Sequence, residues 1–190
     1  MELILIRHGL PLRSDATSDP PLAAEGHEQA RRVGERLGRE RVDAIYASTM
    51  RRAAQTAEPL RSLLGHELQL REALVEFDRG SGTYVPMEEL KRDDYAAWKA
   101  FVDGGYAVDI EPFQSLVVQA LEDIIQRHPA KTVAVFCHGG VINVWTAHVL
   151  GMAPRLFFEP AYASIHRYLC ARGGERNLVS LNDVAHLIDG

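Results

Sequence analysis

The chain has 190 residues, which is enough for one sizeable hydrophobic core and short for two. Hydrophobic residues make up 46% and charged residues 25%, as in an ordinary soluble globular domain. The formal net charge of -5 gives little electrostatic support to a nucleic-acid partner, so we expect none. No apolar run approaches the roughly 20 residues of a membrane helix, and the N-terminus does not resemble a signal peptide. We therefore expect one cytoplasmic domain over residues 1–190, with no membrane partner.

The first half of the chain alternates short apolar runs with stretches in which apolar residues have helical spacing. In chain order these predict a strand at residues 3–6, a Pro-rich loop at 11–21, a helix at 23–39, a strand at 42–47, a helix at 50–64 and a strand at 67–70. Ser48 is the expected N-cap of the second helix, because its hydroxyl can accept a backbone N–H there.

The second half begins with a helical segment and ends with a hairpin. In chain order it predicts a helix at residues 86–101 that ends before Gly104-Gly105, a helix at 112–128, a strand at 132–137, a helix at 141–150, and hairpin strands at 165–170 and 177–181. Strands that alternate with helices imply a mostly parallel sheet covered on both faces. We therefore expect an α/β fold, a three-layer α/β/α sandwich, with residues 79–111 as a small helical cap insertion.

Histidines, arginines and glycines follow three of the predicted strands. Arg7-His8-Gly9 ends the first strand, residues 48–52 follow the second, and His138-Gly139-Gly140 ends the strand at 132–137 and opens a helix. In an open parallel sheet these ends meet at one edge, where ligands bind. Arginines and a helix N-terminus favour an anion, and a histidine can be a nucleophile near neutral pH. The sequence thus predicts a phosphate-sized pocket that contains a nucleophile.

The same residue types allow a second interpretation, a metal site. His8, His138 and His166 would be its ligands, but no metal-ligand spacing appears among the histidines or between Cys137 and Cys170. We interpret the two cysteines as buried reduced thiols, since both fall in apolar strand-like runs. The expected site therefore has no metal and no cofactor.

Six segments follow one another in a recognisable order. They are Arg7-His8-Gly9; Asp19-Pro20-Pro21-Leu22 with Gly26 and Gln29-Ala30; residues 48–57; Glu76-Phe77-Asp78-Arg79-Gly80; residues 137–142; and Leu181-Asn182-Asp183 with His186-Leu187. Together they resemble the histidine phosphatase superfamily, which includes the phosphoglycerate mutases. The similarity spans nearly the whole chain, and it is the set of segments, not any one of them, that is specific.

The resemblance implies a metal-independent phosphomonoesterase that hydrolyses a small phosphorylated metabolite through a phosphohistidine. His8 would be the nucleophile, and His138 would act with it in catalysis. Arg7, Arg52 and Gly139 would bind the substrate phosphate. Of the two adjacent arginines at the predicted helix start, the usual family spacing selects Arg52, and the other is expected to face solvent.

Two further assignments depend on details of the resemblance. Glu76 is the expected proton donor, because the Glu-x-Asp-x-Gly spacing favours it over Glu72, which stands in a similar frame four residues earlier. Residues 10–13 replace the family's usual residues after the first motif, and Arg13 is a candidate to compensate as a phosphate ligand. Residues 111–115 depart from the family pattern as well. Both regions shape substrate choice, so the substrate is not carried over.

Two other functions remain open from the sequence. A phosphoglycerate mutase must shield its phosphohistidine from water, which favours long enclosing loops, whereas this chain is short and its cap is modest. A non-catalytic module that binds a phosphate ligand is the third interpretation, although every candidate reactive residue is present. A small phosphorylated substrate is the expected partner, and the oligomeric state is open, a homodimer included.

Overall fold

A mixed six-stranded sheet forms the centre of the part of the chain that the computed structural model describes, residues 1–77, 79–80, 82–104 and 109–188. Its strands are β1 (Glu2–Arg7), β2 (Ala44–Ser48), β3 (Leu68–Arg71), β4 (Thr132–Cys137), β5 (Ile165–Cys170) and β6 (Arg176–Asp183). Their order is β3-β2-β4-β1-β5-β6; the first four are parallel, and β5 and β6 pair antiparallel at one edge. The predicted mostly parallel sheet and its closing hairpin are confirmed.

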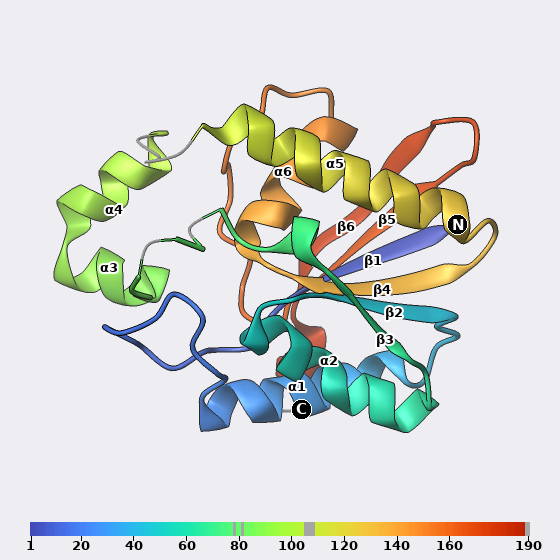
Figure 1. Cartoon of the computed structure of the whole chain (residues 1–190), viewed down its shortest axis with the longest axis horizontal. Coiled ribbons are helices and arrows are strands. Elements are labelled where there is room, and N and C mark those ends of the chain that lie inside the picture. The colour runs from blue at the N-terminus through green and yellow to red at the C-terminus, as the bar shows by residue number, and fades with distance from the viewer. Residues whose placement is uncertain (78, 81, 105–108, 189–190) are drawn as a thin grey trace.

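Helices cover both faces of the sheet (Figure 1). On one side are α1 (Ala24–Leu37) and α2 (Arg51–Leu64), and on the other are α5 (Ile110–Arg127) and α6 (Gly139–Val149). Alternate side chains of a strand point to opposite faces, so Leu3 and Leu5 pack under α5 and α6, whereas Ile4 and Ile6 pack under α1 and α2. This arrangement confirms the three-layer α/β/α sandwich.

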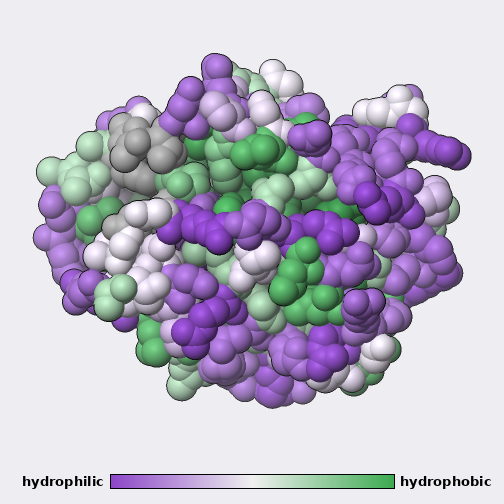
Figure 2. Space-filling view, viewed as in Figure 1, coloured by the Kyte–Doolittle hydropathy of each residue, from purple (hydrophilic) through white to green (hydrophobic). Residues whose placement is uncertain are grey.

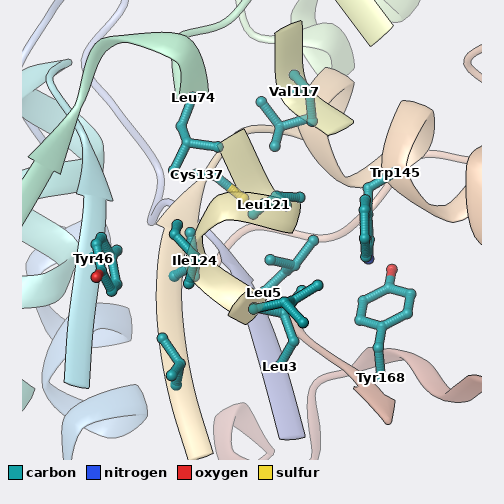
Figure 3. Packing of buried hydrophobic residues seen from close by; sticks show 14 of the residues in the cluster. Leu3, Leu5, Tyr46, Leu74, Val117, Leu121, Ile124, Cys137, Trp145 and Tyr168 are labelled. Carbon is teal, nitrogen blue, oxygen red and sulfur yellow. The ribbon is translucent and has the colours of Figure 1, made fainter. Parts of the chain in front are cut away.

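The core beneath α5 and α6 packs α6 against the sheet (Figure 3). Trp145 of α6 meets Tyr168 of β5 edge to face, with ring centroids 6.2 Å apart, and the Tyr168 hydroxyl lies 2.7 Å from Thr146 Oγ1. Full burial of each such side chain contributes about 1.5–3 kcal/mol. Cys137 lies in this core and Cys170 is buried as well; both are free thiols, as predicted, and burial raises the pKa of Cys170 to about 11.

The segment after β3 leaves the sheet and forms a small helical cap beside the carboxyl ends of the parallel strands (Figure 1). It passes through a 3-10 turn, η1 (Glu72–Leu74), and contains α3 (Met87–Asp93) and α4 (Tyr95–Val102). The predicted single helix at 86–101 is therefore wrong. Asp94 interrupts it with φ −144° and ψ 79°, and its Oδ1 accepts the Ala97 N–H at 2.9 Å. An aspartate side chain competes with the helix for backbone N–H groups, which favours a new helix start there.

Two helix starts also differ from the prediction. Met50, not Ser48, is the N-cap residue of α2; Ser48 is the last residue of β2, although its Oγ does accept the Met50 N–H at 3.2 Å. The helix predicted from residue 141 begins at Gly139. Of the glycine pair expected to end the cap helices, Gly104 has φ +99°, and residue 105 lies outside the described residues.

The face in view is mostly hydrophilic, with apolar residues gathered around α5 (Figure 2). Among the helices that the structure describes, none is both long enough and apolar enough to cross a membrane. A second 3-10 turn, η2 (Ala185–Leu187), follows β6 and packs Leu187 against the core under α1 and α2.

Candidate active site

The carboxyl ends of β1, β2 and β4 bring the predicted residues together at one edge of the sheet. Arg7, the last residue of β1, pairs in parallel register with Cys137, the last residue of β4. The next residues in the two strands, His8 and His138, therefore lie side by side, with ring centroids 5.1 Å apart. Arg52, in the first turn of α2, lies next to them and is fully buried. Arg7, His8, Arg52 and His138 thus lie together at the sheet edge, as the positions of the strand ends in the sequence predicted.

The hydrogen bonds of His8 define its tautomer. Nδ1 lies 2.8 Å from the Gly9 carbonyl oxygen, which can only accept, so Nδ1 carries the proton. Nε2 accepts from Arg52 Nε at 3.2 Å and therefore holds a lone pair. Burial, followed by the Arg52 and Arg7 guanidinium groups, lowers the pKa of His8 well below its ordinary value. The imidazole is consequently neutral near pH 7, with Nε2 available as a nucleophile.

Arg7 is held in place by the loop that precedes β5. Its Nη1 donates to the Pro160 carbonyl oxygen, and its guanidinium carbon lies 3.9 Å above the centre of the Tyr162 ring. A Cβ built on Gly139 would lie 3.8 Å from Arg7 Nε, so the N-terminus of α6 faces this arginine. A helix N-terminus and a fixed guanidinium together favour an anion between them.

Arg52 is positioned by the loop between β1 and α1. Its Nη1 donates to the Ser18 carbonyl oxygen at 2.9 Å and lies 3.7 Å from Asp19 Oδ1. Its guanidinium carbon is 4.9 Å from the centre of the Tyr84 ring. The neighbouring Arg51 is exposed. Of the two adjacent arginines, Arg52 is therefore the buried one and Arg51 faces solvent, as expected.

His138 is buried and neutral, since burial and then Arg52 lower its pKa well below the ordinary value. Its Nε2 lies 2.9 Å from Ser48 Oγ. Ser48 Oγ accepts the Met50 N–H and can donate its own proton to Nε2. In that tautomer the ring proton of His138 is on Nδ1, where it can be donated to a ligand.

Three buried nitrogens in this cluster have no hydrogen-bond partner among the residues that the structure describes. They are Arg7 Nε, Arg52 Nη2 and His138 Nδ1. A buried donor without a partner costs about 1–3 kcal/mol, more when it is charged. These unpaired donors surround one nucleophilic imidazole. A ligand with several anionic oxygens could accept hydrogen bonds from all of them, and a phosphoryl group is such a ligand.

Glu76 lies in the same pocket and Glu72 does not. The Glu76 side chain is buried; Oε2 accepts the Gly140 N–H at 2.9 Å and Oε1 accepts that of Phe77 at 3.1 Å. Glu72 is exposed, forms an ion pair with Arg79 and accepts from Thr49 Oγ1 at 2.6 Å. Of the two carboxylates considered from the sequence, the structure places Glu76 within the site.

Arg13 and His166 lie away from the phosphate cluster. The Arg13 side chain is half exposed and forms an ion pair with Glu89 at 3.1 Å, outside the residues that line the pocket. His166 uses Nε2 with Ser164 Oγ at 2.9 Å, and its Nδ1 accepts the Asn182 N–H at 3.2 Å. Within the described ranges, no group of three or more His, Cys, Asp or Glu could hold a metal ion.

Sequence reasoning did not identify three side chains that shape the site. Tyr162 and Tyr84 each lie under one arginine, and their hydroxyls are 3.3 Å apart. Asn143 of α6 accepts the N–H groups of Phe157 and Phe158 and donates to the Phe158 carbonyl, which fixes one wall of the pocket. The spacing of Asn143 four residues after Gly139 was a weak signal, and the two tyrosines had none.

A nucleophilic imidazole among buried anion-binding donors, at the carboxyl edge of a parallel sheet, is the arrangement of a phosphoryl-transfer enzyme. The chain belongs to the histidine phosphatase superfamily (branch 1), whose family model matches residues 3–184. The resemblance found in the sequence is thereby confirmed, and the chain is a phosphoric monoester hydrolase of this superfamily.

Individual relatives cover nearly all of the chain. Phosphoserine phosphatase 1 of Hydrogenobacter thermophilus is 26% identical in an alignment 204 residues long, which covers 98% of this chain and 94% of the relative. A probable phosphoglycerate mutase, GpmB of Enterobacter sp. (strain 638), is 29% identical over 174 residues, 86% and 78% of the two chains. The structure of phosphoserine phosphatase from Entamoeba histolytica in complex with 3-phosphoglyceric acid superimposes with a TM-score of 0.79 at 26% identity, covering 98% and 99%.

Proposed function

We propose that the chain hydrolyses the phosphomonoester of a small metabolite through a phosphohistidine formed on His8. The observation that carries this proposal is the Nε2 lone pair of a neutral, buried His8 beside the unpaired donors of Arg7, Arg52 and His138. Named relatives that act on phosphoserine, and one solved with 3-phosphoglyceric acid, support a small phosphorylated substrate.

In the first step, His8 Nε2 attacks phosphorus in line with the leaving oxygen. The Arg52 N–H that Nε2 accepts in the free enzyme would pass to a phosphoryl oxygen, which frees the lone pair. The N–P bond forms as the ester P–O bond breaks, and a protonated Glu76 gives its proton to the leaving oxygen. Arg7, Arg52 and His138 hold the equatorial oxygens, and the loss of one such donor typically costs about 10²–10³ in rate.

In the second step, water attacks the phosphohistidine from the side that the alcohol has left. Glu76, now a carboxylate, takes a proton from this water as the O–P bond forms and the N–P bond breaks. The products are inorganic phosphate and neutral His8, with the proton restored to Glu76. The carboxylate lies at the N-terminus of α6 through its bond from Gly140 N, beside the predicted phosphate position.

Alkaline denaturing quench of the enzyme with radiolabelled p-nitrophenyl phosphate tests the covalent step. The native protein is expected to trap an acid-labile, base-stable phosphoryl adduct, and His8→Ala is expected to trap none. Arg13→Ala is the matched control for a surface substitution near the cap, because Arg13 lies outside the pocket lining. Turnover without a His8-dependent adduct would falsify the phosphohistidine. Full loss of activity with EDTA would contradict the metal-independent reaction.

The mutase alternative is separated from hydrolysis by the product. With 3-phosphoglycerate as substrate, a mutase forms 2-phosphoglycerate and retains the phosphoryl group, whereas a hydrolase releases inorganic phosphate. We expect phosphate release across a panel of esters. Conversion of 3- to 2-phosphoglycerate at a rate above that of phosphate release would contradict the proposal.

A further inference from the structure

The pocket that contains His8 extends well beyond the phosphate cluster, with a volume of about 430 Å³. From the cap it is lined by Val85, Met87, Leu90 and Trp98, and from the loop before β5 by Phe157 and Phe158. A volume of this size is in the range of pockets that enclose a small organic ligand. The part of the substrate that follows the phosphate would therefore meet apolar and aromatic side chains.

The apolar wall on the side of β5 is held in one conformation. Asn143 Oδ1 accepts the N–H groups of Phe157 and Phe158 at 2.8 and 3.2 Å. Asn143 Nδ2 donates to the Phe158 carbonyl at 3.0 Å and to that of Gly139 at 2.9 Å. The phosphate-binding end of α6 and the aromatic wall are thus joined through one side chain. A preformed surface binds with a smaller loss of conformational entropy than a mobile one.

The positive charge in the pocket is concentrated at the phosphate end. Among the lining residues that the structure describes, Arg7 and Arg52 are the cations, and both face the phosphate position. Glu159 also lines the pocket; partial burial and the nearby Glu88 carboxylate raise its pKa, while Arg7 and Lys91 act in the opposite direction. A substrate carboxylate in the apolar part of the pocket would be desolvated against apolar groups.

Two cations near the cap have partners. Arg13 pairs with Glu89 at 3.1 Å, and the Lys91 ammonium lies 4.5 Å from the centre of the Trp98 ring. Among the described lining residues, therefore, no Lys or Arg beyond Arg7 and Arg52 is placed to bind a second anionic group on the substrate, such as the carboxylate of phosphoserine or of a phosphoglycerate.

We propose that this enzyme selects phosphomonoesters whose alcohol is uncharged and apolar, of the size of an aromatic ring with a short linker. The proposal rests on the hydrolase function proposed above and specifies its substrate class. The phosphate would occupy the Arg7, Arg52 and His138 donors, and the ring would lie between Trp98 and the wall of Phe157 and Phe158. One added methylene in an apolar pocket is typically worth about 10–200-fold in kcat/KM, so a ring has a large effect.

Steady-state phosphate release from esters of primary alcohols tests this selectivity, because their leaving oxygens are chemically similar. We expect kcat/KM for 3-phenylpropyl phosphate to exceed that for O-phosphoserine, 3-phosphoglycerate and glycerol 3-phosphate by about 10²-fold. Glycerol 3-phosphate is uncharged beyond its phosphate and separates the effect of charge from that of apolar surface. A preference below tenfold over any of the three overturns the proposal.

A cap variant tests where the ring binds. Trp98→Ala is expected to lower kcat/KM for 3-phenylpropyl phosphate at least tenfold more than that for glycerol 3-phosphate. Leu63→Ala is the control: its leucine is exposed on α2, outside the pocket, and the ratio of the two substrates should not change. An unchanged ratio in folded Trp98→Ala overturns the placement of the ring. If that variant does not fold, the substrate series on native protein still decides the proposed selectivity.

The two proposals fail in different ways. Without hydrolase function, native protein releases no phosphate from any of these esters or from p-nitrophenyl phosphate, and forms no His8 adduct. If only the selectivity is wrong, phosphate is released through a His8-dependent adduct, but an anionic ester such as O-phosphoserine is hydrolysed as well as the apolar one.

Discussion

At the residue scale, the site is an arrangement of buried groups that control one another's protonation. His8 is kept neutral by its burial and by Arg52 and Arg7, and the Gly9 carbonyl directs its proton to Nδ1. The same arginines retain buried donors without a partner among the described residues. In the proposed mechanism, the charges that would bind the phosphate also keep the imidazole neutral.

The two candidate carboxylates can be separated by matched substitutions. Glu76→Gln keeps an oxygen for the Gly140 N–H but cannot transfer a proton, so we expect kcat to fall about 10²–10⁴-fold on alkyl phosphates. The loss on p-nitrophenyl phosphate should be smaller, since its leaving group needs less protonation. Glu72→Gln removes an exposed ion pair with Arg79 and should stay near the native rate. Equal losses in both variants would argue against Glu76 as the proton donor.

At the element scale, the N-terminus of α6 is the structural link between phosphate binding and proton transfer. Its first residue, Gly139, faces Arg7, and its second, Gly140, donates to Glu76. Asn143, one turn further, holds the loop that carries the aromatic wall. Contacts to three separate chain segments therefore depend on the position of one helix, which packs on the core that contains Trp145.

A methyl group at Gly140 tests how closely this helix end approaches Glu76. The added Cβ would clash with Glu76 Oε1 and would lie 2.7 Å from Phe77 Cδ1. Gly140→Ala is therefore expected to displace the carboxylate and to lower kcat by about 10² or more, as loss of general acid catalysis does. Gly139→Ala should leave the carboxylate in place, because the Cβ on residue 139 points toward Arg7 Nε, 3.8 Å away, and not toward Glu76. Steady-state assays on alkyl phosphates and on p-nitrophenyl phosphate, with thermal unfolding, compare the two variants; a loss in Gly140→Ala that is equal on both kinds of substrate would contradict this account.

At the scale of the whole molecule, function and stability place opposite demands on the buried histidines. His8, His138 and His166 are all buried, and burial is the main cause that lowers the pKa of each; that of His166 falls to about 3. Each would become charged in the unfolded chain near its ordinary pKa of about 6.5. Below that pH the unfolded state binds more protons than the folded state, so acid favours unfolding.

The free energy of unfolding is accordingly expected to decrease as pH falls from about 6.5 toward 5. The slope for each neutral buried histidine approaches about 1.4 kcal/mol per pH unit well below its unfolded pKa. Carboxylates with a depressed pKa, such as Asp43 at about 2, contribute mainly below this range because their unfolded pKa is near 4. Urea unfolding at several pH values measures the slope. His166→Asn, which removes one of the three groups, should flatten it, and a stability independent of pH between 7 and 5 would contradict the prediction.

The predictability of the fold differs between its layers and its cap. The sandwich could be predicted because alternate residues of β1 supply both cores, and because helical spacing marks α1, α2, α5 and α6. The helix at 86–101 was wrong because its apolar residues continue across Asp94, whose side chain starts a new helix instead. Few residues of the cap are buried, so periodicity there says little about packing.

The sequence by itself determined the strand ends, and hence that His8, Arg7 and His138 would meet, because strand periodicity and the terminating glycines are local properties of the chain. The motif spacing also favoured Glu76 over Glu72, and the structure has Glu76 in the pocket. Only the tertiary structure decided which other neighbours surround the site: Arg13 pairs with Glu89 away from the pocket, and the tyrosines lie beneath the arginines. These contacts join residues far apart in the chain. They depend on sheet register and on how the loops pack over the sheet edge, which no local pattern encodes.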